Sequence, residues 1–529
     1  MEPAHYLVLP FSNWALHETF IRSAEVSRKL VVDRITATRS ALVAMEKSHQ
    51  QLVAQLAAIN ADIETWRRRL LPVGRLPRDI LSYIFELSIA DETSAFLEEK
   101  SDDPIASLVG CRSQAFSVAA VSKTWRETAL ATPRLWSKVH LDFSRLATKN
   151  IDSPDLFSAL SLGVERWTPY LALTLERSKA TLLDFDLLHF GSELLSRHSE
   201  YRSAFMSVLS QAHRWRSFSL STSSLGEEDE YIALYFQRQT PLLELFRITH
   251  AGYITGPLRP SLTMRFLPCI PLLRTLDIPA DLLECVAFAA APALRHLRLH
   301  CGVVSIAALC DILRGSPELE ALSIRDVTNA DTLSSGEHEL CEFPKLTSIE
   351  IHDGTSEILE SWGSRISCPS LRSLLLDEHC EDLWAAPTSS LFTTVAHLSV
   401  AVIRSYRGTL SAVLCRFPQL ETLELLEGSV EPGDFTALNK PQTGDPSRWL
   451  CPRLCSIVFS GLVVFAGRGV AEDLLDFVQA RAAPVENLAV EARLQSVTFA
   501  NVVTASRVPL WLPDAIADVL AIAKPACML

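Results

Sequence analysis

The first pattern of apolar residues in this chain recurs every three or four positions. From about Ser23 to Leu70 the sequence holds neither glycine nor proline, the residues that most often end a helix. With Thr38 and His49 filling two places, steps of three and four alternate along Ile35, Leu42, Met45, Leu52, Leu56, Ile59, Ile63, Trp66 and Leu70. This spacing is that of a coiled-coil seam. We predict a long helix over 23–70 that pairs with itself, pairs with another chain or folds back, and we assign no structure to 1–22.

A second pattern, P-x-L-x-x-L-x-[LIV], returns throughout the second half of the chain. It appears at 271–278, 292–299 and 317–324, and in several later copies. From Leu273 to Leu420 the first apolar position of each copy steps by 21, 25, 27, 25, 24 and 25 residues. A period in the twenties with this spacing is the leucine-rich-repeat pattern, in which each copy stacks on the next. The predicted fold class is therefore α/β, with a leucine-rich-repeat solenoid over 211–500 and a cap or tail over 501–529.

The stretch before these copies carries a weaker signal. Residues 140–210 are expected to form an irregular linker or an N-terminal cap of the solenoid. Within them, 167–175 alternates apolar and polar residues like a strand. Asp184 and Asp186 are two carboxylates on one predicted strand face, and we interpret them as solvated because the sequence supplies no further metal ligands beside them.

Polar residues lie between the apolar positions of each copy. Side chains alternate along a strand, so these residues should face away from the core and line the concave face of the solenoid. A mixed polar surface of this kind suits the binding of a protein substrate. The candidate residues are Thr275, Asp277, His296, Arg298, Ser323, Arg325, Ser348, Glu350, His352, Ser373, Asp377, His397, Ser399, Thr422, Glu424 and Ser456.

A third pattern lies between the long helix and the repeats. It reads LP-x-x-I-L-x-x-I-F from Leu76, then V-x-x-V-S-x-x-W-R from Val118, then P-x-L-W from Pro133. Together these motifs resemble the F-box of the large families found in mushroom-forming fungi. The resemblance covers 72–139, and it is interrupted at 90–113 by an acidic insertion.

The resemblance implies a substrate-recognition subunit of an SCF-type cullin–RING ubiquitin ligase, with F-box-like helices that dock on the Skp adaptor. The alternative is a non-catalytic scaffold, in which these helices pack internally and the coiled coil drives self-association. The residues expected to contact the adaptor are Leu76, Pro77, Ile80, Leu81, Ile84, Phe85, Val118, Val121, Trp125 and Trp136.

Composition and missing motifs narrow the function further. The 529 residues carry a net charge of −13, which argues against nucleic acid as the main partner. No phosphate-binding, dinucleotide-binding, hydrolase or metalloprotease motif occurs, so we expect no enzyme activity, no cofactor and no metal site. The twelve cysteines show no metal-binding spacing and are expected to be free thiols. With no secretory signal or membrane span in the sequence, we expect an intracellular location, in the cytoplasm, the nucleus or both.

Overall fold

The computed structural model describes twenty stretches of the chain. Two compact units are formed by Met1–Ile84 and by Phe85–Leu529. Residues 91–113 of the acidic insertion at 90–113 and the candidate residue Asp377 lie outside the described residues. The twenty described stretches are residues 12–70, 76–90, 114–142, 168–190, 199–222, 235–250, 266–286, 291–304, 306–329, 341–352, 366–376, 393–404, 414–430, 433, 435–439, 450–465, 469–482, 493–500, 508–509 and 511–523.

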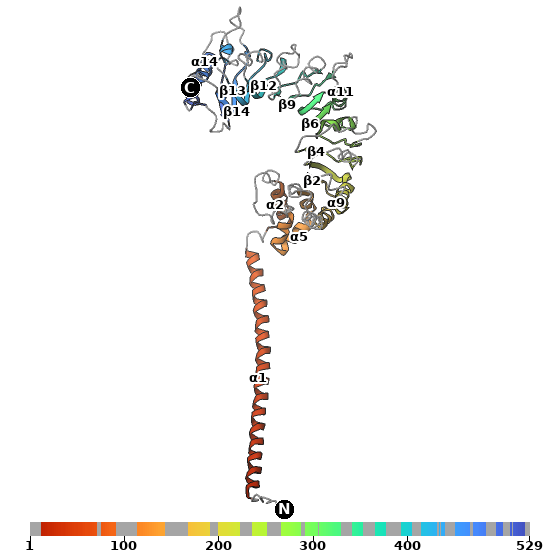
Figure 1. The fold of residues 1–529 in the computed structure, drawn as a ribbon, viewed down its shortest axis with the longest axis vertical. Coiled ribbons are helices and arrows are strands. Elements are labelled where there is room, and N and C mark those ends of the chain that lie inside the picture. The colour runs from red at the N-terminus through yellow and green to blue at the C-terminus, as the bar shows by residue number, and fades with distance from the viewer. Residues whose placement is uncertain are drawn as a thin grey trace, which may run out of the picture. The chain divides into compact units, whose positions relative to one another are not determined.

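The first unit is dominated by a single long helix, α1 (Ser12–Leu70), which confirms the predicted helix (Figure 1). Its 59 residues span about 88 Å at the usual helical rise. The helix begins at Ser12 rather than near residue 23, because no glycine or proline interrupts the chain between Ser12 and Leu70. Part of the stretch left unassigned in the sequence, 12–22, is therefore helical.

Short helices follow α1 along the chain. They are α2 (Arg78–Ala90), α4 (Gln114–Val121), α5 (Lys123–Ala131) and the 3-10 helix η2 (Pro133–Trp136). Ser122 caps α5, since its hydroxyl accepts a hydrogen bond from the Trp125 amide at 3.2 Å. Pro133 occupies the first turn of η2, where a missing amide costs no internal hydrogen bond.

The second unit is built on one sheet of 13 strands, so the α/β class is confirmed. Every strand is parallel to its neighbours, and the strands lie in sequence order, as the run from β2 to β14 in Figure 1 shows. A separate two-stranded sheet pairs β8 (Cys341–Glu342) with β10 (Ile366–Ser367). The strands of the large sheet are β1 (Lys138–Asp142), β2 (Leu183–Phe190), β3 (Trp215–Thr222), β4 (Leu245–His250), β5 (Thr275–Pro279), β6 (His296–Val304), β7 (Ala321–Asn329), β9 (Ser348–His352), β11 (Ser373–Leu376), β12 (His397–Arg404), β13 (Thr422–Val430), β14 (Ser456–Phe465) and β15 (Ser496–Ala500).

The core lies on one face of this sheet. The repeated leucines and isoleucines, such as Leu276, Leu297 and Leu322, are at most 1% exposed. Towards the N-terminal end aromatic rings take their place, and the rings of Trp215 and Phe218 stack with centroids 4.5 Å apart. In β9 and β11 the buried positions alternate with half-buried ones, so one strand face enters the core and the other remains open.

Helices cover the core face of the sheet. They are α9 (Ser199–Ser210), α11 (Ile306–Gly315), α14 (Val470–Ala482) and α15 (Leu512–Ala523), together with the 3-10 helices η3 (Ala212–Arg214), η5 (Ala280–Cys285) and η9 (Thr436–Asn439). Leu309 and Ile312 of α11, for example, belong to the same buried cluster as the strand leucines. The face that carries the polar residues is left accessible.

One expectation for the region before the repeats is wrong. Residues 168–178 form a helix and not a strand, because the buried positions Leu171, Thr174 and Ser178 follow helical spacing. Within 140–210, expected to be an irregular linker or an N-terminal cap of the solenoid, β2 joins the large sheet between β1 and β3. Within the described part of the chain, no helix is both long enough and apolar enough to cross a membrane.

Candidate functional site

The residues expected to dock on an adaptor divide into exposed and buried groups. On α2, Ile80 is 44% exposed and Ile84 is 43% exposed, whereas Leu81 and Phe85, one position further along, are 2% and 1% exposed. Leu76, Pro77 and Val121 are also exposed, Val118 and Trp125 are half-buried, and Trp136 is fully buried. The apolar pattern therefore contains two stripes, one inside the fold and one open to solvent.

Trp136 is a core residue that ties the short helices to the start of the sheet. Its indole N–H donates to the Ala129 carbonyl at 2.9 Å, and its ring meets Phe116 edge-on with centroids 4.9 Å apart. The Arg177 guanidinium, from the helix at 168–178, lies 4.4 Å from the centre of the same ring. Leu81 and Phe85 are likewise interior, and Phe85 packs on Trp125 at 4.9 Å. The geometry leaves none of these three side chains free to contact an adaptor.

The polar residues predicted from the repeats come together on the open face of the sheet. Because the strands are parallel and in register, residues from equivalent positions form rows that run across the strands. The first row is mainly hydroxyl and imidazole groups: Thr275, His296, Ser348, Ser373, His397, Thr422 and Ser456, with Ala321 between His296 and Ser348. The second row carries most of the charges: Asp277, Arg298, Ser323, Glu350, Leu375, Ser399 and Glu424. Arg325 and His352 are paired in a third row.

Asp277 and Ser399 differ from the other described candidates because they are only 6% and 4% exposed. The Arg247 Nε atom donates to the Asp277 carboxylate at 3.0 Å, and the His300 ring lies 3.7 Å from its other oxygen. His300 also approaches the Ile248 carbonyl at 2.7 Å. Asp277 therefore organises its neighbours and does not itself present a free carboxylate to a ligand.

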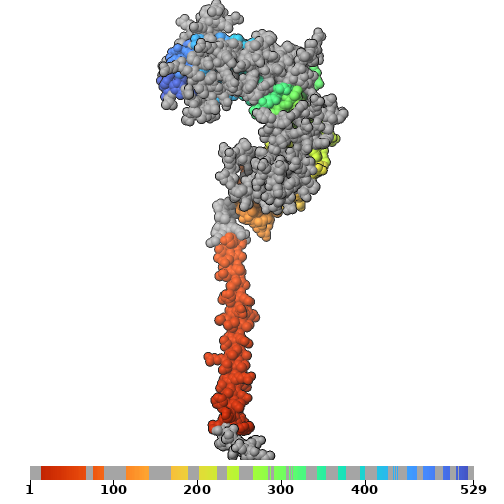
Figure 2. Space-filling model, in the orientation of Figure 1, coloured from red at the N-terminus to blue at the C-terminus, as the bar shows by residue number. Residues whose placement is uncertain are grey.

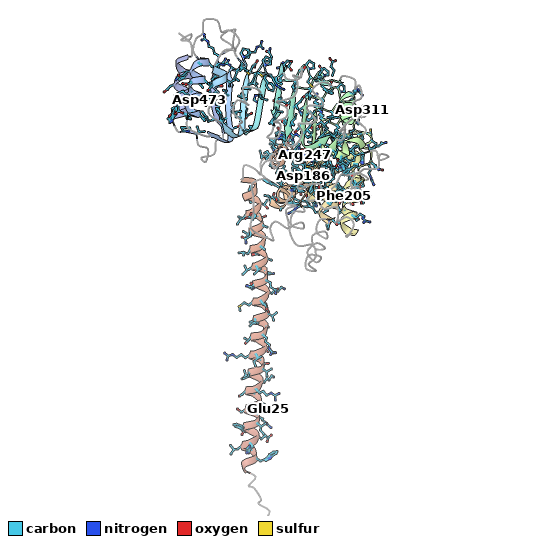
Figure 3. The ribbon with its side chains drawn as sticks, turned by 45° about the horizontal axis from the view of Figure 1, so that its top comes forward. Glu25, Asp186, Phe205, Arg247, Asp311 and Asp473 are labelled. Atoms are coloured by element: carbon cyan, nitrogen blue, oxygen red, sulfur yellow. The ribbon has the colours of Figure 1, made fainter. Side chains whose placement is uncertain are left out.

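The N-terminal end of the open face holds a similar charge cluster on β1, β2 and β3. Asp184 accepts hydrogen bonds from the Arg216 guanidinium and from the Ser217 hydroxyl at 2.9 Å, and the bond to Asp184 raises the pKa of Arg216 above its usual value. Asp186 accepts from His140 at 2.9 Å. Figure 3 labels Asp186 and Arg247, which come from β2 and β4 of the sheet. Sequence reasoning missed Arg216 and Arg247, although aligning the weaker repeat copies would place Arg247 in the row of Asp277.

A groove of about 550 Å³ opens beside this cluster. Arg134, Lys138 and Arg216 give it a basic lining, and the Arg134 guanidinium lies 3.6 Å from Glu86. No pattern in the sequence predicts this groove, because its walls come from segments far apart in the chain. Its lining residues are Glu86, Arg134, Leu135, Ser137, Lys138, Ala180, Thr181, Leu182 and Arg216.

The described part of the open face contains one Ser–His–Glu group, on β12 and β13. Ser399 Oγ lies 3.0 Å from the His397 ring nitrogen and donates to Glu424 at 2.9 Å. The same His397 nitrogen, Nε2, also lies 3.5 Å from Glu424, whereas in a hydrolytic triad the carboxylate contacts the other ring nitrogen of the histidine. Ser399 is only 4% exposed and its hydroxyl proton is directed to the carboxylate, so the group joins the two strands and does not activate a nucleophile.

Metal and thiol chemistry add little to this surface. Among the described residues, no group of histidines, cysteines and carboxylates is placed to hold a metal ion. Six of the cysteines are free thiols, namely Cys269, Cys301, Cys368, Cys415, Cys451 and Cys455, and burial raises the pKa of both Cys368 and Cys451 to about 12. These two thiols are therefore packed in the core in their neutral form.

Comparison with models of known protein families and with curated proteins finds no match to this chain. A function for this chain therefore has to be argued from the two surfaces described above. These are the exposed apolar stripe of α2 and the polar open face of the sheet.

Proposed function

We propose that this chain is the substrate-recognition subunit of an SCF-type cullin–RING ubiquitin ligase. The F-box-like helices of 72–139 dock on the Skp adaptor. The sheet and its covering helices form a leucine-rich-repeat solenoid, whose concave face is the open face described above and binds a protein substrate. The chain performs no chemistry itself, since holding a substrate beside the ubiquitin-loaded enzyme raises their effective concentration.

The observation that carries this proposal is the uncovered stripe of α2. Ile80 and Ile84 lie one helical turn apart, and both expose more than two fifths of their surface. Leu81 and Phe85 already supply the apolar contacts that anchor the helix to its own fold. Branched apolar side chains left in water on a well-packed helix are a feature of surfaces that bind another protein.

The order of the strands supports the second part of the proposal. Thirteen parallel strands in sequence order, with one apolar face and one open polar face, are what stacked leucine-rich repeats would produce. The open face offers neutral hydroxyl groups in one row and charges of both signs in the next. Such a surface can bind backbone groups and charged side chains of an extended protein segment.

The alternative is a scaffold in which the F-box-like helices pack internally. The exposure of Ile80, Ile84 and Val121, the last at 62%, favours the adaptor-binding proposal, because internal packing would bury these side chains. The self-association in that alternative is compatible with either function.

Binding of the full-length chain to purified Skp adaptor tests the proposal. The double variant Ile80→Asp/Ile84→Asp places charge in the stripe without entering the core, so we expect at least about a tenfold loss of affinity, or more than 1.4 kcal/mol. Leu272→Asp is a matched control, because Leu272 is 45% exposed but lies in the repeat region. Leu81→Ala would be a poor probe, since a buried residue reports on folding.

The control variant should bind the adaptor as the wild-type chain does, and circular dichroism should show that all variants are folded. A wild-type chain that does not bind the adaptor contradicts the proposal. Equal losses in the stripe variant and the Leu272→Asp control would also contradict it, because the effect would then not be specific to α2.

A further inference from the structure

Helix α1 exposes a second apolar surface, which is separate from the stripe of α2. All of its described side chains, from Trp14 to Trp66, are exposed, as the uncovered red rod of Figure 2 illustrates. Large residues are included: Trp14 is 74% exposed, Phe20 73% and Met45 70%. An isolated helix with this much apolar surface in water is not stable by local propensity alone and requires a partner.

The seam of α1 runs almost the whole length of the helix. Continuing the alternating steps of three and four back from Ile35 gives Val31, Arg28, Ala24, Ile21, His17 and Trp14. From Trp14 to Ile63 the seam is about 73 Å long, and a strip about 10 Å wide covers about 730 Å² per helix. That area is close to the roughly 800 Å² per partner of a stable protein interface.

We propose that α1 pairs with α1 of a second copy of this chain in an antiparallel coiled coil centred on Ser40. In this register, residues whose numbers add up to 80 lie opposite each other, so every seam position from Trp14 to Trp66 meets a seam position of the other helix. Ile21 lies opposite Ile59 of the second copy, and Ile35 lies opposite Met45 of the second copy. The apolar layers are thus paired from end to end without an overhang.

The polar residues of the seam select the antiparallel direction over the parallel one. In a parallel pair Arg28 would face Arg28 of the second copy inside the seam, and the flanking residues Arg34 and Arg39 would face each other across it. Two desolvated like charges at close range are costly. In the antiparallel pair Arg28 faces Leu52 of the second copy and can extend its charged end to water along that side chain.

Charges beside the seam also fit the antiparallel pair. Arg39 comes within reach of Glu46 of the second copy, which offsets the approach of the two Arg39 side chains near the centre. Opposite charges in these flanking positions determine orientation in coiled coils. The helix dipoles also oppose each other favourably in this arrangement.

The antiparallel pair has a consequence for the rest of the molecule. Each chain leaves α1 at Leu70, and the two Leu70 positions are about 90 Å apart, 60 residues along the rod. A parallel pair would bring them together. The two chains of the dimer therefore leave the coiled coil at opposite ends. The pairing itself does not depend on the adaptor-binding proposal.

The first experiment measures the mass of the full-length chain by light scattering during gel filtration. One chain has a mass of 58.6 kDa, so we expect about 117 kDa. Leu42→Asp, in the seam, should return the mass to that of one chain. Val43→Asp is the matched control, because Val43 is 63% exposed and Leu42 58%, but Val43 points away from the seam. This control should remain a dimer.

The second experiment determines the direction by pulsed electron paramagnetic resonance. A nitroxide on a genetically encoded keto amino acid at Thr19 avoids the twelve native cysteines. The antiparallel pair predicts a distance of about 63 Å between the two labels, whereas the parallel pair predicts roughly 20 Å. A label at Ser40, near the centre, should give a short distance.

Three results would overturn the proposal. A single-chain mass for the wild type at tens of micromolar means that α1 does not pair with itself. A dimer that persists in Leu42→Asp means that the interface lies elsewhere. A short distance between labels at Thr19 means that the helices are parallel. Binding of the single chain to vesicles of anionic lipid, abolished by Leu42→Asp, would show that the seam faces a membrane surface instead.

Discussion

Replacing Gly302 by alanine should destabilise the sheet far more than a glycine substitution normally does. Gly302 lies in β6 with φ +124°, a backbone conformation that residues with a side chain rarely adopt. A Cβ added there would lie 2.8 Å from the carboxyl carbon of Asp281. That carboxylate is 8% exposed and accepts a hydrogen bond from the Val303 amide at 2.6 Å.

The expected cost has two parts. An alanine held at this φ costs about 1–3 kcal/mol in backbone strain. The new methyl group also displaces the Asp281 carboxylate, and losing a charge-assisted hydrogen bond in a buried place costs about 1.5–3 kcal/mol. We expect Gly302→Ala to lower the free energy of unfolding by about 3–5 kcal/mol.

A substitution at Gly469 separates the cost of backbone strain from the cost of displacing a carboxylate. Gly469 has φ +99°, and a Cβ built there meets no atom within 4 Å. Gly469→Ala should therefore cost only the strain of about 1–3 kcal/mol. Urea unfolding of the full-length chain, followed by circular dichroism at an unchanged slope, measures both variants.

A double variant tests the mechanism directly. When Asp281 is already alanine, the clash is absent, so adding Gly302→Ala should cost about 1.5 kcal/mol less than it does in the wild-type chain. Strictly additive costs would refute the reasoning. So would a Gly302→Ala variant that is no less stable than Gly469→Ala.

Two further predictions concern the core. The folded state keeps the Cys368 thiol protonated to about pH 12, while the unfolded chain releases the proton near pH 9, so stability is lost as the pH rises from 9 to 12, at about 1.4 kcal/mol per unit. Cys368→Ala should lose less stability than the wild type when urea midpoints at pH 8 and pH 10 are compared, and equal losses would contradict the prediction. Trp136→Ala should cost about 3–5 kcal/mol in urea unfolding, whereas alanine at the 37%-exposed Leu173 should change stability by less than about 0.5 kcal/mol.

The sequence predicts the strands best where the same apolar position recurs in each copy of the repeated pattern. The leucine spacing located strands such as β9 and β11 and also their buried positions, because side chains alternate between the two faces of a strand. The two-residue pattern gives a wrong prediction at 168–178. Leucines two positions apart resemble a strand there, but the chain forms a helix whose buried positions are three and four residues apart. One period can be imitated by another over a short stretch, and only the surrounding core decides between them.

The sequence predicts the candidate binding surfaces only in part, for a related reason. The apolar pattern of α2 includes Ile80, Leu81, Ile84 and Phe85, but the pattern does not say which half of a wide stripe the protein itself covers. Charge pairs such as Arg247 with Asp277 join residues 30 positions apart, and they become neighbours only through the register of the strands. Tertiary pairing of this kind cannot be read from local periodicity.

Among its described residues the protein has three accessible surfaces: the open face of the sheet, the seam of α1 and the stripe of α2. They differ in the kind of partner that each can bind. The open face of the sheet is polar and its charges are largely paired within the chain, as at Asp277, so it can remain in water between binding events. The seam of α1 and the stripe of α2 are apolar and gain free energy mainly by leaving water, at about 25 cal/mol per Å². In the proposed function, the seam buries about 730 Å² per helix, which is much more than two isoleucines can bury, so we expect self-pairing to be tighter than adaptor docking. Binding of a charged substrate segment by the polar face should weaken as the salt concentration rises.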